Sequence, residues 1–336
     1  MVQSLRAGLL SAAVLLLSAP AVADDQLQVA VSIKPIHSLV SAVTRGASEP
    51  HLIVKGGGSP HTYSLRPSNA EALEQADAVF WVGPDLETFL IGPIGQLAPQ
   101  ARKVSFQEVE GLVRLPVRDG GGFEPHSHDH AEGHSHDHAE GHSHDHDHDH
   151  DHDGKEPQAD RPGAFNAHYW LDPANAQLFV SHVATVLGEI DPDHADTYRR
   201  NATETLERLA SLTDEMEAVL APVAGEPFVV FHDAYQYLEN RFGLNAVGSI
   251  TLSPDRSPGA GRIAEIRDKI AELGAACIFA EPQFESRLVG ILVEETQARA
   301  GILDPLGADL PDGPDLYFEL MRRNADALRA CLQQSS

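Results

Sequence analysis

Histidine is the residue type with the most evident chemistry in this sequence. The chain has 19 histidines among 336 residues, and its 24 basic and 50 acidic side chains give a formal net charge of −26. Imidazole nitrogen is a common ligand of zinc and related metals. So large an acidic excess argues against nucleic acids or anionic membranes as partners. The composition therefore favours cations.

Three of the seven histidines outside a histidine-rich segment have a distinctive context. His61 follows a glycine-rich turn, His168 precedes an apolar triplet, and His232 ends an apolar strand-like run. At the carboxyl ends of parallel strands, side chains from different strands converge on one crevice. Three imidazoles plus one carboxylate or water suit tetrahedral zinc. These histidines are therefore candidate zinc ligands, with ordinary packed or surface roles as the alternative for each.

Asp304 is the candidate carboxylate for the fourth position. It ends the short apolar run at residues 300–303 and precedes Pro305. The alternative is an ordinary turn aspartate before proline, in which case water takes the fourth position. The other four histidines outside the histidine-rich segment lack this context; they are His37, His51, His182 and His194.

Residues 124–153 form a histidine-rich insertion with twelve histidines, seven aspartates, three glutamates and no lysine or arginine. Such a segment cannot bury a hydrophobic core, so we predict that it is disordered. Its imidazoles and carboxylates offer weak auxiliary metal sites for capture or buffering; a hydrophilic linker is the alternative. The histidines concerned are His126, His128, His130, His134, His136, His138, His142, His144, His146, His148, His150 and His152.

The amino terminus has the features of a secretory signal peptide. Arg6 precedes an apolar run at residues 9–17, and small residues lead up to Ala23, so we expect cleavage after about Ala23. The run is shorter than the roughly 20 residues that span a bilayer. No cysteine near the cleavage site could carry a lipid anchor. We predict an exported, soluble protein retained in a bacterial periplasm.

Cys277 and Cys331 are the two cysteines of the chain. In an oxidising compartment an isolated pair is more often joined than free, which favours a disulfide. Two buried free thiols are the alternative. Neither cysteine has a partner at metal-ligand spacing, which disfavours a cysteine-based zinc site.

Strand-like and helical patterns alternate in both halves of the chain, which is typical of parallel sheets covered by helices. Ser68 and Glu71 form a capping-box pattern that predicts a helix start just after Pro67. Apolar residues recur at three- and four-residue intervals from Asp193 to Leu220, which predicts one long helix. The predicted fold is α/β, with two lobes, each a mostly parallel β-sheet flanked by helices, joined by one long backbone helix.

The predicted elements divide the chain into four parts. Strands are expected at residues 29–33, 51–54, 78–82, 228–231, 244–250, 277–280 and 301–303. Helices are expected at residues 36–44, 69–75, 86–98, 193–220, 234–242, 263–273, 287–298 and 317–332. The parts are a signal peptide at 1–23, an N-terminal lobe at 24–190 containing the insertion 124–153, a connecting helix at 191–222 and a C-terminal lobe at 223–336.

Five segments resemble, in the same order, motifs of the ZnuA family of periplasmic zinc-binding proteins. They are Ser59–Ser68, Asn166–Pro173, Phe231–Tyr235, Phe279–Phe284 and Leu303–Gly307. The resemblance runs from about residue 26 to the carboxyl end. It implies the cluster A-I solute-binding fold, zinc bound as cargo in a cleft between the lobes, and delivery to an inner-membrane ABC permease.

Carried over position by position, the resemblance implies that His61, His168 and His232 are the zinc ligands. The spacing of Cys277 and Cys331 also resembles a disulfide of that family. Manganese and iron relatives typically have glutamate where His232 stands, so imidazole there favours zinc. Some zinc members use a glutamate just before the first histidine as fourth ligand. Pro60 stands there in this chain, so Asp304 or water must complete the coordination sphere.

The predicted function is high-affinity zinc capture for import by a monomeric binding protein that is not an enzyme. One alternative is a secreted three-histidine zinc hydrolase, which needs a general base such as Asp233 or Glu281. These residues have simpler expected roles as a helix N-cap and a turn residue, and the chain has no His-Glu-x-x-His motif. The other alternative is a metal buffer or adhesin acting through the histidine-rich segment. The sequence leaves open the permease contacts, the extent of lobe closure and selectivity against cobalt, nickel and cadmium.

Overall fold

The structure is a computed structural model that describes residues 26–118, 121–123, 165–251, 259–284 and 287–333. The predicted signal peptide with its cleavage site and the histidine-rich insertion with its twelve histidines lie outside the described residues. Those predictions therefore stay untested. Within the described ranges, no helix is both long and apolar enough to cross a membrane.

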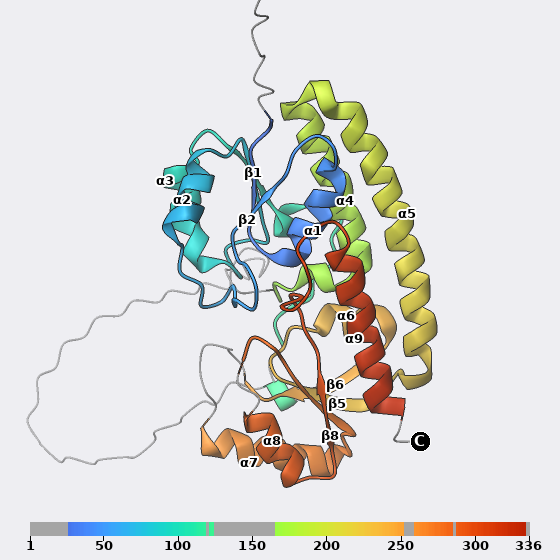
Figure 1. Cartoon of the computed structure of the whole chain (residues 1–336). Coiled ribbons are helices and arrows are strands. Elements are labelled where there is room, and N and C mark those ends of the chain that lie inside the picture. Colours follow the sequence, from blue (N-terminus) through green and yellow to red (C-terminus); the bar gives the residue numbers. More distant parts are fainter. Residues whose placement is uncertain (1–25, 119–120, 124–164, 252–258, 285–286, 334–336) are drawn as a thin grey trace, which may run out of the picture.

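The N-terminal lobe is built on a four-stranded parallel sheet with strand order β2-β1-β3-β4. Its strands are β1 (Val29–Val31), β2 (His51–Leu52), β3 (Ala78–Trp81) and β4 (Arg102–Ser105). Its helices are α1 (Lys34–Thr44), α2 (Pro67–Glu74), α3 (Ile91–Leu97) and α4 (Pro173–Ile190). Figure 1 shows α2 and α3 on one face of the sheet and α1 and α4 on the other. Helices on both faces explain why the central strand β1 is apolar and wholly buried.

The C-terminal lobe repeats this plan with a second four-stranded parallel sheet, in the order β6-β5-β7-β8. Its strands are β5 (Pro227–Val230), β6 (Asn245–Ser249), β7 (Cys277–Ala280) and β8 (Arg299–Ile302). Its helices are α6 (Gln236–Phe242), α7 (Ala260–Leu273), α8 (Arg287–Glu294) and α9 (Leu316–Leu332). The predicted two-lobed α/β fold is confirmed.

Helix α5 (Ala195–Leu220) connects the lobes and runs along both of them (Figure 1). Its 26 residues span about 39 Å at 1.5 Å per residue. It packs against α1 and α4 of the first lobe and against α9. One continuous apolar core includes residues of both lobes, from Val31 and Phe80 to Phe279 and Tyr317. The predicted long helix is confirmed, although a short 3-10 turn at Pro192–His194 precedes it.

The structure differs from the sequence-based prediction at several boundaries. Strand β4 was not predicted, and the single helix expected at residues 86–98 is a 3-10 turn followed by α3. The capping-box prediction is wrong, because Arg66 is the N-cap of α2 without a side-chain bond and Pro67 is already helical. Proline suits the first helical position because its φ angle is preset and its missing N–H needs no partner there.

The disulfide between Cys277 and Cys331 is present in the structure and ties β7 to helix α9. The predicted pairing is therefore confirmed. Because α9 also packs against α1 and α5, the bond links the C-terminal sheet to the helices that both lobes share.

Part of the predicted N-terminal lobe packs on the C-terminal lobe. The Leu115 amide donates to the Tyr237 hydroxyl at 3.1 Å. Arg118 pairs with Asp233 and with Glu239, whose carboxylate is 2.9 Å away. The sequence suggested Asp233 as the N-cap of α6. In the structure Asp233 pairs with Arg118 instead, and the N-cap of α6 is Tyr235.

Candidate metal centre

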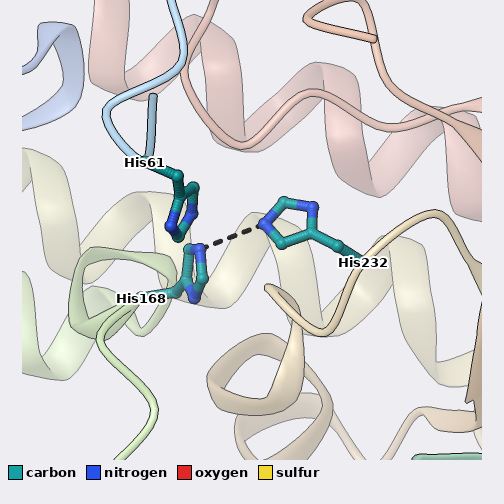
Figure 2. A group of neighbouring side chains, drawn as sticks. All are labelled: His61, His168 and His232. Carbon is teal, nitrogen blue, oxygen red and sulfur yellow. Dashed lines mark hydrogen bonds between the residues drawn. The ribbon is translucent and has the colours of Figure 1, made fainter. Parts of the chain in front are cut away.

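His61, His168 and His232 meet at one point between the lobes (Figure 2). Their ring nitrogens that could serve as ligands all lie within 4.8 Å of one another. His61 lies on the loop between β2 and α2, and His168 lies just before the short 3-10 helix that leads into α4. His232 follows β5 of the second sheet. Both lobes thus contribute to the cluster that the sequence predicted.

The three rings line a small cavity of about 10 Å³. That volume suits a single ion or one water molecule. Ser59, Trp170, Gln283 and Leu306 are among the other residues that border it. His168 and His232 are 7% and 4% exposed, while His61 is partly exposed, so the cavity is closed mainly on the side of the first two.

Hydrogen bonds on the far side of two rings fix where their protons lie. His168 Nδ1 is 2.7 Å from Asn166 Oδ1, and His232 Nδ1 is 2.7 Å from Glu281 Oε1. Both oxygens accept, so each Nδ1 carries the hydrogen and each Nε2 keeps a lone pair.

The two Nε2 atoms are 3.2 Å apart (Figure 2). With both Nδ1 positions protonated, no hydrogen lies between the Nε2 atoms, and their lone pairs repel. A cation between them removes the repulsion. Two nitrogens bound to tetrahedral zinc at ordinary bond lengths would be about 3.3 Å apart. The separation therefore matches the spacing that two ligands of one zinc ion require.

The surroundings of the cluster keep the His61 and His168 rings neutral. Burial, assisted by the nearby His232, lowers the pKa of His61 from 6.5 to about 3. Burial also lowers the pKa of His168 well below 6.5, with smaller contributions from His232 and His61. A neutral imidazole has a lone pair free for a metal. The same burial that disfavours protonation therefore prepares these two side chains for coordination.

Two residues that orient the ligands were not predicted from the sequence. Glu281 was expected only as a general base or a turn residue, and Asn166 was assigned no role. The Glu281 side chain is fully buried and holds His232, while Asn166 holds His168 from two positions earlier in the chain. Strand pairing supplies the missing signal for Glu281. Val229 of β5 pairs with Ile278 of β7. His232 follows Val229 by three residues, and Glu281 follows Ile278 by three residues, so the two side chains come just after neighbouring strands.

Asp304 does not join the three histidines. Its Oδ1 accepts from the Leu306 amide at 2.9 Å and from Gln283 Nε2 at 2.7 Å. Its Oδ2 accepts from the Ala308 amide at 2.6 Å. The carboxylate therefore organises the loop after β8. The histidines set aside by the sequence analysis also stay away from the cluster; for example, His37 Nε2 lies 2.9 Å from the Pro50 carbonyl.

Replacing Glu281 by alanine is expected to weaken zinc binding by about 10- to 100-fold, the usual effect of losing a partner of a metal-bound histidine. The Glu281→Gln variant retains an acceptor for the His232 N–H and should lose less. Glu294→Ala, at the exposed end of α8, is a matched control. Competition titration against a chelator measures all three, and wild-type affinity for Glu281→Ala would contradict the orienting role.

Comparison with known proteins gives consistent results. The family model described as ZnuA, zinc-uptake complex component A, periplasmic, matches residues 29–331. The high-affinity zinc uptake system protein ZnuA of Brucella suis is 53% identical over 312 residues, which cover 93% of each chain. The protein of the same description from Paracoccus denitrificans is 38% identical over 306 residues, covering 91% of each chain. A crystal structure of ZnuA shares the fold, with a TM-score of 0.71 at 20% identity, over 91% of this chain and 99% of that chain.

Proposed function

We propose that His61, His168 and His232 hold the Zn²⁺ ion that this chain carries as cargo. The chain belongs to the ZnuA family of periplasmic zinc-uptake components. The protein is the periplasmic zinc-binding component of a zinc-uptake ABC system, and its family serves transport and not catalysis. The finer details are proposed as well: export with cleavage after about Ala23, a monomeric carrier, and delivery of the ion to the inner-membrane permease of that system.

One observation carries the ligand assignment. His168 Nε2 and His232 Nε2 lie 3.2 Å apart with both Nδ1 protons engaged elsewhere, which is unfavourable without a cation and suitable with zinc. His61 completes the set within 4.8 Å. Water is proposed as the fourth ligand, because both oxygens of Asp304 already accept hydrogen bonds from the protein.

The hydrolase alternative is not favoured. A catalytic zinc site needs a general base beside its water. The two residues that the sequence suggested for this role are engaged elsewhere, since Glu281 accepts from His232 and Asp233 pairs with Arg118. The alternative of a buffer or adhesin acting only through the histidine-rich segment gains no support from family membership.

Buried contacts beside the cavity favour small relative movements of the lobes. Trp170 Nε1 donates to the Pro305 carbonyl at 2.8 Å, and the Tyr317 hydroxyl donates to the Trp170 carbonyl at 2.7 Å. Lys34 Nζ, from α1, donates to the Leu310 carbonyl at 2.7 Å. A wide hinge motion would break these buried bonds, so we propose that loading and release use a limited rocking motion.

The direct test of this function is calorimetric zinc titration of variants in which each of the three histidines is replaced by alanine. Tight binding that survives any one of these replacements would remove that residue from the site.

Zinc affinity is expected to decline only modestly between pH 7.5 and pH 5. Protons compete for a ligand only below its pKa, and three ordinary histidines would each cost about thirtyfold over this range, more than about ten-thousandfold together. Because burial lowers the pKa of His61 to about 3 and that of His168 well below 6.5, both remain neutral. The loss should therefore be far smaller than for three ordinary histidines. Titrations at both pH values measure it, and a ten-thousandfold loss would show that His61 and His168 titrate as ordinary histidines.

A further inference from the structure

Gln283 lies two residues beyond Glu281 and borders the cavity of the three histidines. Its Nε2 donates to Asp304 Oδ1 at 2.7 Å. A carboxylate only accepts, so the NH₂ end of the amide must face Asp304 and Oε1 must face another way. Gln283 Oε1 is buried and has no hydrogen-bond partner among the described residues. Asp304 therefore fixes an amide whose acceptor is left unsatisfied by the protein.

Two further oxygens beside the cavity share this property. In the described part of the chain, Ser59 Oγ and Glu281 Oε2 are buried without a hydrogen-bond partner, and both residues border the same cavity. Buried acceptors are rarely left unpaired, so several at one cavity indicate a bound polar species that the protein alone does not supply. The cavity is large enough for one such species beside the rings.

We propose that Gln283 positions the fourth ligand of the zinc ion, a water molecule that donates a hydrogen bond to Gln283 Oε1, and that Asp304 acts through Gln283 by orienting its amide. This inference rests on the proposed function, because it needs the three histidines to hold the ion. Zinc makes its bound water more acidic and so a stronger donor. A neutral acceptor that cannot itself donate is matched to that water. Asp304 thereby influences the ion without touching it.

The test is a double-mutant cycle on Gln283 and Asp304, read out as zinc affinity by chelator competition. Gln283→Leu removes the acceptor while retaining bulk, and should weaken binding about tenfold, the lower end of the effects seen around metal sites. Asp304→Asn should weaken binding in the wild-type background and cause no further loss in the Gln283→Leu background, because its effect passes through the same amide. Gln297→Leu, exposed in the same lobe, is the matched control and should bind as the wild type does.

Two more variants separate the outcomes. Gln283→Asn retains both ends of the amide, an N–H donor for Asp304 and an oxygen acceptor, and should bind zinc more tightly than Gln283→Leu; equal or weaker binding would overturn the proposal. His61→Ala tests the proposed function in parallel. If His61→Ala loses tight binding while Gln283→Leu does not, the role of Gln283 is wrong and the proposed function stands.

The remaining outcomes are equally decisive. If His61→Ala binds as tightly as the wild type, the proposed function itself fails. An equal loss for Asp304→Asn in both backgrounds would mean that Asp304 acts independently of Gln283, which also overturns the proposal. Thermal unfolding of each metal-free variant identifies any variant that fails to fold. If Asp304→Asn fails to fold, the comparison of Gln283→Leu with Gln283→Asn decides the case.

Discussion

Replacing His232 by alanine is expected to lower zinc affinity by more than about a hundredfold, because loss of a direct ligand should exceed the 10- to 100-fold cost of losing an outer partner. The change also leaves the Glu281 carboxylate buried without its N–H donor. Similar losses are expected for His61→Ala and His168→Ala, which remove the other two members of the cluster. Chelator competition at pH 7.5 measures each affinity.

Two controls sharpen this experiment. His182→Ala changes a histidine on α4 outside the cluster, and should bind zinc as the wild type does. Deletion of residues 124–153 removes the histidine-rich insertion, and should retain one tight site while losing weaker binding. If the deletion variant lost the tight site and all three alanine variants retained it, the insertion, and not the histidine cluster, would be the high-affinity zinc site.

Removing the disulfide is expected to cost about 4 kcal/mol of unfolding free energy in the loop-entropy account. Cys277 and Cys331 are 54 residues apart in sequence, and their bond ties β7 to α9. The Cys277→Ser, Cys331→Ser double variant should therefore unfold at a lower urea concentration, measured without metal by circular dichroism.

Chemical reduction of the wild-type protein is the control for side effects of the two serines. It should lower stability by a similar amount, since it opens the same loop. A loss below about 1 kcal/mol in both cases would mean that packing of α9 against α1 and α5, and not the covalent bond, holds the helix in place.

The general fold could be predicted because its signals are local. Buried parallel strands such as β1 and β7 are continuous apolar runs, and α5 repeats apolar residues at helical intervals over its whole length. Strand β4 escaped prediction because its first two residues, Arg102 and Lys103, are charged and exposed at the edge of the sheet. An edge strand with one short buried end carries little periodic signal.

The centre was predictable only in part, for a related reason. The three histidines stand out because each is next to a strand-like or apolar run, and together they resemble family motifs. Glu281 could be identified only after β5 and β7 were known to be neighbours. For Asp304 the position just after a strand was predicted, but its hydrogen-bond partners were not. Its oxygens accept from the amides of Leu306 and Ala308. Sequence indicates which groups are close, and not which partner each one takes.

The apolar core that both lobes share limits how cargo can leave. Separating the lobes would expose buried apolar side chains such as Trp170 and Tyr317, which contact each other across the lobes, and the free energy required grows with the area exposed. His61 stands apart from this constraint, because its loop lies between β2 and α2 and its ring is the least covered of the three. Release of that loop first would therefore expose the least apolar surface, and it would leave the ion bound by His168, His232 and the proposed water, with one position open to a competing ligand.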